Sequence, residues 1–419
     1  MIEPATPVGR RRFLQLTATS GAAVIVSAAP GAPTASAALV RKKRVYVVVV
    51  DGCRPDEITL TQTPQLHALR SQGMHFPNAR SLPVMETIPN HTMMMTGVRP
   101  DRSGVPANSI YDRAEATVRD MDRPSDLRAP TVLKRLRGLG FTTGSVLSKE
   151  YLFGIFGTQA TYRWEPEPVL PITEHAPDVA TMDATLAMID SVDPNLVFVN
   201  LGDCDRVGHG DVTGTTVAVA RRAALLSADE QMGRLVAHLR NTGRWVNAVL
   251  VVLADHSMDW SYPDRIVSLA PVFAADPLLA GRVTIAQNGG ADLLYWTGSS
   301  AQRMAAVSRM RELATATEGV LSVLAPSRLR LSPLAGDLVA YCKAGWRFSD
   351  PAPSSNPIPG NHGHPATEPI PFFIAGGSAL VQSGTTSSSL VQTVDVAPTV
   401  GRVFGLTAPS GGYDGRSRL

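Results

Sequence analysis

The sequence has little cysteine and almost no excess charge of either sign. Its three cysteines, Cys53, Cys204 and Cys342, allow at most one disulfide. A protein of this size does not need disulfides to fold, so we expect buried free thiols. The formal net charge of +3 over 419 residues excludes the strongly basic surface typical of nucleic-acid-binding proteins. A hydrophobic content of 44% with 18% charged residues is typical of a globular protein with a large core.

The first 37 residues have the composition of an export signal. Arg10-Arg11-Arg12 precedes an alanine-rich apolar run that ends at Ala29, and Ala35-Ser36-Ala37 offers small residues at a cleavage position. This order is typical of a twin-arginine signal peptide, and the apolar run is too short for a good membrane span. Removing residues 1–37 takes away three arginines and Glu3, which lowers the net charge from +3 to +1. We therefore expect export to the periplasm, cell wall or medium, with an uncleaved anchor or a disordered tail as alternatives.

Apolar runs and helical segments alternate along residues 44–419. The run at 45–50 is β-branched and lacks polar alternation, which is typical of a parallel strand buried on both faces. Similar runs lie at 144–147, 195–200, 248–254 and 371–374. Helical patterns lie at 64–72, 131–137, 181–192, 215–240 and 394–404. This alternation predicts an α/β fold with a central, mostly parallel sheet and helices on both faces.

Residues 261–345 break this alternation. Apolar strand-like stretches occur there at 266–272, 283–287, 292–296 and 321–324, with one helical stretch at 301–314. We expect a small α+β insertion, or lid, within a single domain that spans residues 44–419.

A hydroxyl residue stands where a helix is expected to begin. Thr87 is followed by Pro89, then by the polar Asn90 and His91, then by the apolar residues 93–95. Proline is favoured in the first turn of a helix. Free N–H groups and the positive dipole end suit a nucleophile that meets an anionic substrate, although a capping role for Thr87 is the alternative. His91 is expected to hydrogen-bond the backbone near Thr87 rather than to bind metal.

Acidic residues and histidines follow several predicted strands or lie in loops between them. They are Asp51, Asp205, His209, Asp255, His256 and His362. In open α/β sheets, ligands bind beyond the carboxyl ends of the strands. Asp205 and His209 have the i, i+4 spacing that points two side chains the same way on a helix, with Asp203 as the alternative acid. Such oxygen and nitrogen ligands suit zinc, and also manganese or iron.

These motifs resemble those of the type I phosphodiesterase/nucleotide pyrophosphatase family of the alkaline phosphatase superfamily. The matching segments are 50–54, 63–76, 87–91 with 96–97, 104–108 with 111–112, 205–210, 255–258, 360–363 and 395–399. The resemblance implies an alkaline-phosphatase-like fold and a hydrolase that forms a phospho-threonine intermediate on Thr87. It also implies that Asn108 contacts a phosphoryl oxygen of the substrate.

The same resemblance implies two divalent metal ions, zinc before other metals. The residues expected on one ion are Asp205, His209 and His362. The residues expected on the other ion are Asp51, Thr87, Asp255 and His256.

The sequence departs from the family pattern near the substrate. Ile88 follows Thr87, where nucleotide-selective members tend to carry an aromatic residue, and residues 148–152 replace the Trp-Pro-Gly element of the animal enzymes. Lys149 in that segment is similar to a lysine of phosphonoacetate hydrolases and is expected to bind a second anion of the substrate. The expected substrate is a small phosphodiester, pyrophosphate or nucleotide rather than a nucleic acid duplex. A phosphonoacetate-hydrolase-like phosphonate hydrolase is the second hypothesis, and a non-catalytic binding protein on the same fold is the third.

Overall fold

The structure is a computed structural model that describes residues 42–170, 174–210 and 216–419. The expected signal peptide at residues 1–37 lies outside the described residues. Within the described ranges, no helix has the length and apolar character needed to cross a membrane. Cys53, Cys204 and Cys342 are all buried free thiols, as expected.

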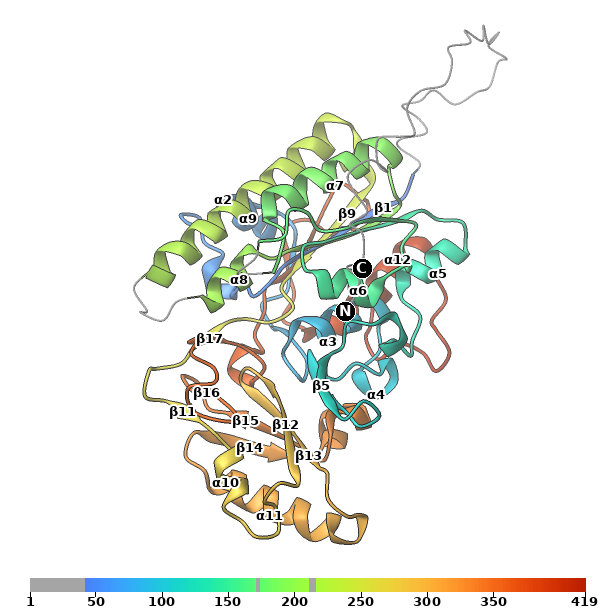
Figure 1. Ribbon diagram of the computed structural model, residues 1–419. Coiled ribbons are helices and arrows are strands. Elements are labelled where there is room, and N and C mark those ends of the chain that lie inside the picture. The colour runs from blue at the N-terminus through green and yellow to red at the C-terminus, as the bar shows by residue number, and fades with distance from the viewer. Residues whose placement is uncertain (1–41, 171–173, 211–215) are drawn as a thin grey trace, which may run out of the picture. The chain divides into compact units, whose positions relative to one another are not determined.

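An eight-stranded sheet forms the centre of the described chain (Figure 1). The strand order is β19 (Thr385–Thr386), β2 (Met74–His75), β18 (Phe372–Ala375), β9 (Ala248–Leu253), β1 (Arg44–Val50), β8 (Leu196–Leu201), β6 (Thr143–Leu147) and β7 (Tyr162–Trp164). Every residue of β1, β8 and β9 is buried, because apolar side chains on both faces pack under helices. β1 pairs in parallel with both β8 and β9.

The sheet changes direction at β18. That strand runs antiparallel to β9 on one side and to β2 on the other, whereas β9, β1, β8, β6 and β7 are parallel. The predicted α/β fold with a mostly parallel central sheet is therefore confirmed.

Helices cover both faces of the central sheet (Figure 1). One layer holds α2 (Pro64–Gln72), α7 (Asp178–Val192) and α9 (Thr216–Asn241). The other layer holds α3 (Thr87–Thr96), α5 (Val132–Gly138) and α12 (Val396–Phe404). Met93, Met94 and Met95 of α3 are fully buried, so the expected apolar face of this helix does pack into the core.

A second sheet of four antiparallel strands lies within the segment that breaks the alternation. Its order is β12 (Val283–Asn288), β13 (Ala291–Trp296), β15 (Leu338–Cys342) and β14 (Val320–Leu324). α10 (Ala270–Ala274) and α11 (Arg303–Ala316) pack with it around a separate apolar core. Of the strand expected at 266–272, only β11 (Ile266–Val267) forms, and the prediction is wrong for the rest. Pro271 has no N–H to donate within a strand and instead lies in the first turn of α10. The limits 261–345 of the insertion stay a prediction.

Short elements complete the connections around the strand ends. They are α4 (Pro100–Ser103), α6 (Glu150–Phe156), α8 (Asp203–His209), β3 (Ala79–Arg80), β4 (Ser109–Asp112), β5 (Thr117–Asp120), β10 (Asp259–Trp260), β16 (Arg347–Phe348), β17 (Gly360–Asn361) and β20 (Val391–Gln392). α8 follows β8 after a single residue, Gly202, so the end of that strand and the start of a helix meet beside β1.

Candidate active site and metal centre

Thr87 is the first residue of α3, and its side chain is almost fully buried. Its Oγ1 lies 3.2 Å from Nε2 of His256. One turn later, Nδ1 of His91 donates to the carbonyl oxygen of Thr87 at 2.9 Å, while its Nε2 accepts from the Asn200 amide at 3.1 Å. Both nitrogens of His91 are thus engaged, so this histidine holds the start of α3 in place, as expected, and has no lone pair left for a metal.

Three acidic side chains converge beyond the ends of three neighbouring strands. Asp51 follows β1, Asp205 lies in α8 just after β8, and Asp255 follows β9, and all three are buried. Each has one carboxylate oxygen without a hydrogen-bond partner among the described residues: Asp51 Oδ1, Asp205 Oδ1 and Asp255 Oδ2. Buried polar atoms are rarely left unpaired in native proteins, so these three oxygens are suited to bind a cation.

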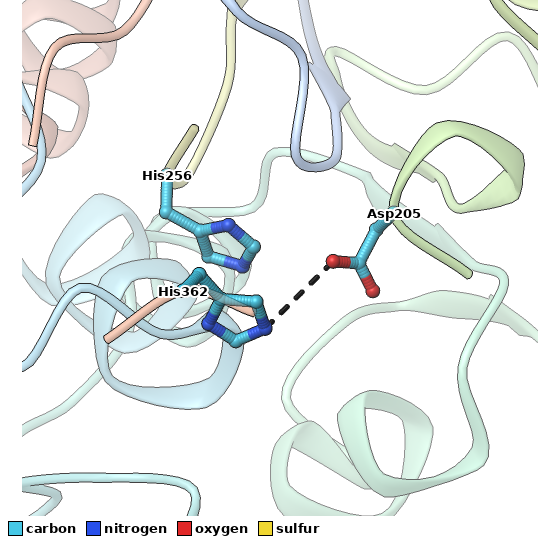
Figure 2. A group of neighbouring side chains, drawn as sticks. All are labelled: Asp205, His256 and His362. Atoms are coloured by element: carbon cyan, nitrogen blue, oxygen red, sulfur yellow. Dashed lines mark ion pairs between the residues drawn. The ribbon is translucent and has the colours of Figure 1, made fainter. Parts of the chain in front are cut away.

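The histidines complete two adjoining groups around these carboxylates. Nε2 of His256 lies 3.7 Å from Asp51 Oδ1 and 3.3 Å from Asp255 Oδ2. Asp205 Oδ1 lies 3.3 Å from Nε2 of His209 and 3.8 Å from Nε2 of His362. The rings of His256 and His362 stack with centroids 3.7 Å apart, and Figure 2 shows both beside Asp205. The structure therefore brings together all the residues that the sequence predicted as metal ligands.

The histidine rings are oriented by backbone carbonyl oxygens. Nδ1 of His209 lies 2.8 Å from the carbonyl oxygen of Gly360. Nδ1 of His256 lies 3.0 Å from that of Ser257, and Nδ1 of His362 lies 3.2 Å from that of Met85. A carbonyl oxygen can only accept, so each Nδ1 carries the hydrogen and each Nε2 keeps a lone pair.

The protonation state of the two most buried rings also fits a metal centre. Burial lowers the pKa of His256 to about 4 and holds the pKa of His362 well below its ordinary value, so both rings are neutral at pH 7. Their lone pairs then face the lone pairs of unpaired carboxylate oxygens, which is repulsive unless a cation lies between them. Neutral imidazoles and carboxylates are the donor set of a divalent metal site. Two sets of ligand atoms lie close enough to hold an ion, Asp205 with His256 and His362, and Asp51 with His91 and Asp255, so His256 lies within reach of either carboxylate group.

Lys149 lies between the two groups of ligands. Its buried Nζ is 2.8 Å from Asp51 Oδ2 and 2.7 Å from Asp205 Oδ2. Burial alone would lower the pKa of Lys149, but Asp205 and Asp51 together raise it above its ordinary value, so the ammonium stays charged. Its expected contact with a substrate anion stays a prediction, and the observed contacts favour a role in holding the two carboxylates.

A cleft opens onto Thr87, and six of the residues that line it are Thr87, Asn108, Tyr151, Asp205, Arg206 and His362. The side-chain Oδ1 of Asn108 accepts from the backbone N–H of Ile88 at 2.8 Å. The backbone N–H of Asn108 donates to Oε2 of Glu86, also at 2.8 Å. Burial raises the pKa of Glu86 to about 8. The Asn108 amide is thereby fixed beside the first turn of α3, and its Nδ2 has no hydrogen-bond partner among the described residues.

Sequence reasoning missed several residues that support the site. Arg221 of α9 donates to the carbonyl oxygens of Gly52 and Cys204, each at 2.8 Å, and so ties together the loops that carry Asp51 and Asp205. Asn200 donates to Asp51 at 2.8 Å, and its position at the end of a predicted strand was the one available signal. Arg206 and Tyr151 of the cleft gave no signal. Most residues that surround them in space are distant in sequence, and the directions of their side chains depend on how α8 and α6 are oriented.

The model of the family "Type I phosphodiesterase / nucleotide pyrophosphatase" matches residues 45–365 of the chain. The chain belongs to this family. Human ectonucleotide pyrophosphatase/phosphodiesterase family member 5 is 21% identical over 397 residues, which cover 88% of this chain and 75% of the relative. Bovine bis(5'-adenosyl)-triphosphatase ENPP4 is 22% identical over 400 residues, which cover 90% of this chain and 81% of the relative.

Solved structures share the fold of this family member. An inactive threonine-to-alanine variant of murine ENPP5 in complex with AMP superposes with a TM-score of 0.73 at 19% identity, covering 88% of this chain and 96% of that one. Phosphonoacetate hydrolase from Sinorhizobium meliloti, in complex with phosphonoformate, gives a TM-score of 0.64 at 18% identity, covering 87% and 96%. The family and the fold that the sequence resembled are thus confirmed.

Proposed function

We propose that this family member is an exported, metal-dependent hydrolase of phosphodiester or pyrophosphate bonds that uses Thr87 as its nucleophile. The observation that carries the proposal is the position of the Thr87 hydroxyl. It lies at the N-terminus of α3, 3.2 Å from a neutral His256 and beside carboxylate oxygens that lack partners. Export is proposed from the twin-arginine pattern of residues 1–37 alone.

Two groups of residues would hold divalent ions, with zinc proposed first because of its preference for histidine and carboxylate ligands. The first group is Asp205, His209 and His362. The second group is Asp51, Thr87, Asp255 and His256. When bound, such ions lower the pKa of a hydroxyl nucleophile and offset the negative charge that develops on the attacking and leaving oxygens.

The chain's own residues then account for the bond changes. Thr87 Oγ1 gives its proton to solvent and attacks the phosphorus. The bond from phosphorus to the leaving oxygen breaks, and that oxygen leaves with the electron pair and takes up a proton from solvent. Water attacks the phospho-threonine, the bond from phosphorus to Oγ1 breaks, and Oγ1 recovers a proton. In this proposal, Asn108, held by Ile88 and Glu86, donates its Nδ2 hydrogen to a phosphoryl oxygen. The products are an alcohol or phosphate and a phosphomonoester.

Nucleotides are the first substrates to test. One relative is named a bis(5'-adenosyl)-triphosphatase, and one structural neighbour holds AMP. Phosphonoacetate is the comparison substrate, because one neighbour is a phosphonoacetate hydrolase. A panel of bis(4-nitrophenyl) phosphate, diadenosine triphosphate and phosphonoacetate ranks these classes by kcat/KM, and a clear preference for phosphonoacetate would overturn the proposed substrate class.

Thr87→Ala is expected to lose at least about a thousandfold in kcat/KM on bis(4-nitrophenyl) phosphate, because losing a nucleophile removes the covalent route. Thr87→Ser keeps the hydroxyl and should retain part of the rate. Mass spectrometry of rapidly quenched wild-type enzyme should show a phosphoryl adduct on the peptide that contains Thr87. The exposed Thr61 supplies the matched control, Thr61→Ala, which should behave like wild type.

Two outcomes would contradict the proposal. If Thr87→Ala keeps more than about a tenth of the wild-type kcat/KM, Thr87 is not the nucleophile. If wild-type protein loaded with zinc binds less than one ion per chain and hydrolyses no ester of the panel, the chain is a binding protein on this fold.

A further inference from the structure

Arg206 is a charged residue of the cleft for which the proposed reaction has no use. It follows the ligand Asp205 in α8 and lines the same cleft as Thr87. Its Nε is buried and has no hydrogen-bond partner, and its guanidinium makes no ion pair with any described residue. A buried polar group without a partner is rare in native proteins, so this guanidinium is suited to bind an anion.

The other charged or polar groups nearby do not supply that anion. The Tyr151 ring lies under the guanidinium, with 5.5 Å from its centre to Arg206 Cζ. Asp205 is committed to Lys149 at 2.7 Å on one oxygen and faces the histidines with the other. Glu174 and Asp120 also line the cleft, but both are exposed at its surface, where water screens them, and neither forms an ion pair with Arg206.

Tyr151 and the planar guanidinium form a preorganised pair. A guanidinium over the face of an aromatic ring is attracted by the ring and can still donate its N–H groups to a phosphate or carboxylate. Because Arg206 lines the same cleft as Thr87, Asp205 and His362, a substrate bound in that cleft can place a second anionic group at the guanidinium.

We propose that Arg206 binds a second anionic group of the substrate, a phosphate or carboxylate on one arm of the ester beyond the phosphorus that Thr87 attacks. The proposal rests on the proposed function and narrows it. The preferred substrates are then pyrophosphates, or phosphodiesters with an anionic arm, rather than diesters with two neutral arms. Selection among them is made by Arg206 rather than by stacking on the residue after the nucleophile, which here is Ile88.

Substrates that share a leaving group test this role. 4-Nitrophenyl phenyl phosphate has one neutral arm, and 4-nitrophenyl carboxyphenyl phosphates carry an added carboxylate on that arm. Arg206→Gln should lower the ratio of kcat/KM between the carboxylate and phenyl substrates by about 10- to 100-fold, the size expected for a charge-assisted contact. Arg206→Lys should restore part of the ratio. Diadenosine triphosphate tests whether a phosphate replaces the carboxylate. The matched control is Arg222→Gln, which removes one exposed arginine of α9 and should leave the ratio unchanged.

A binding measurement separates this proposal from the proposed function. Calorimetric titration with inorganic pyrophosphate and with inorganic phosphate involves no turnover when it uses zinc-loaded Thr87→Ala protein, with and without Arg206→Gln. Arg206→Gln should weaken pyrophosphate at least tenfold more than it weakens phosphate. If no ester is hydrolysed but this binding ratio changes as expected, the hydrolase proposal fails and the role of Arg206 stands.

Three results would overturn the role of Arg206. Equal losses on the two nitrophenyl esters would mean that Arg206 contacts the attacked phosphoryl group itself. An equal loss on every substrate with a lower melting temperature would mean that Arg206 only packs against Tyr151. An unchanged pyrophosphate-to-phosphate ratio in calorimetry would mean that no second anion is bound there.

Discussion

Replacing Lys149 with methionine should destabilise the ion-free protein much more than the zinc-loaded protein. The Lys149 ammonium is fully buried and lies 2.8 Å from Asp51 Oδ2 and 2.7 Å from Asp205 Oδ2. Methionine keeps much of the length of the side chain but removes the charge, so packing changes little. What remains in the ion-free variant is two buried carboxylates, one from each ligand group, without the cation that joins them.

The magnitude follows from what is left unpaired. Removing one partner of a buried ion pair typically costs about 3–5 kcal/mol, because the remaining charge has lost both water and its partner. Asp51 keeps one hydrogen bond, from Asn200 at 2.8 Å, so part of its carboxylate stays satisfied. In zinc-loaded protein the ions neutralise both carboxylates, and we expect the cost to fall to about 1–2 kcal/mol, that of lost hydrogen bonds.

Urea unfolding, followed by tryptophan fluorescence, measures both values. One series contains a chelator and the other saturating zinc, and each compares wild type with Lys149→Met. Lys134→Met supplies the matched control, because Lys134 is exposed on α5 and should change neither curve. A loss of the same size with and without zinc would refute the reasoning, since it would mean that the ammonium and the ions do not compensate the same carboxylates.

The same variant tests the sequence-based expectation that Lys149 binds a substrate anion. In that case Lys149→Met would raise KM selectively for substrates with a second anion and leave the unfolding curves close to wild type. Arg206→Gln is expected to give that selective kinetic effect instead, so the two variants together assign the two cations to separate roles.

Two further predictions concern residues outside the chemical step. Burial, with the neighbouring Asp350, raises the pKa of Asp292 well above its ordinary value of 3.8. The folded state therefore holds a proton that the unfolded state releases. The free energy of unfolding should fall as pH rises above about 4, by at most about 1.4 kcal/mol per pH unit. The melting temperature of Asp292→Asn relative to that of wild type should therefore rise with pH. Gly360→Ala would place a Cβ 2.0 Å from the Gly208 carbonyl oxygen, so it should lower the melting temperature and the zinc content, whereas Gly138→Ala, with open space, should lower neither.

Local patterns were enough to predict where the candidate metal ligands lie. A buried parallel strand has a continuous apolar run, so its end is visible in the sequence, and Asp51 and Asp255 stand just past two such ends. The parallel pairing of β1 with β8 and β9 then brings three acids to one edge of the sheet. The start of α3 was also predictable, because Pro89 and the buried run at Met93–Met95 mark the first turn and the core face.

Features set by long-range packing were not predictable in this way. The apolar run of β18 is the same whether the strand is parallel or antiparallel, and only its position between β9 and β2 fixes its direction. β15 was missed although Leu338–Cys342 is a buried five-residue run, because its pairing with β13 and β14 depends on residues distant in sequence. The partners of Lys149 lie 98 and 56 residues away along the chain, and no local signal records such a separation.

The charges gathered at the site explain why the substrate should be anionic at two points. Three carboxylates and one ammonium, those of Asp51, Asp205, Asp255 and Lys149, surround neutral His256 and His362. Metal binding requires the carboxylates to be ionised, so two divalent ions would leave an excess of two positive charges. An ionised Thr87 oxygen and the single charge of a phosphodiester neutralise that excess. The guanidinium of Arg206 lies in the same cleft without an ion pair among the described residues, and a second anion on the substrate would supply one.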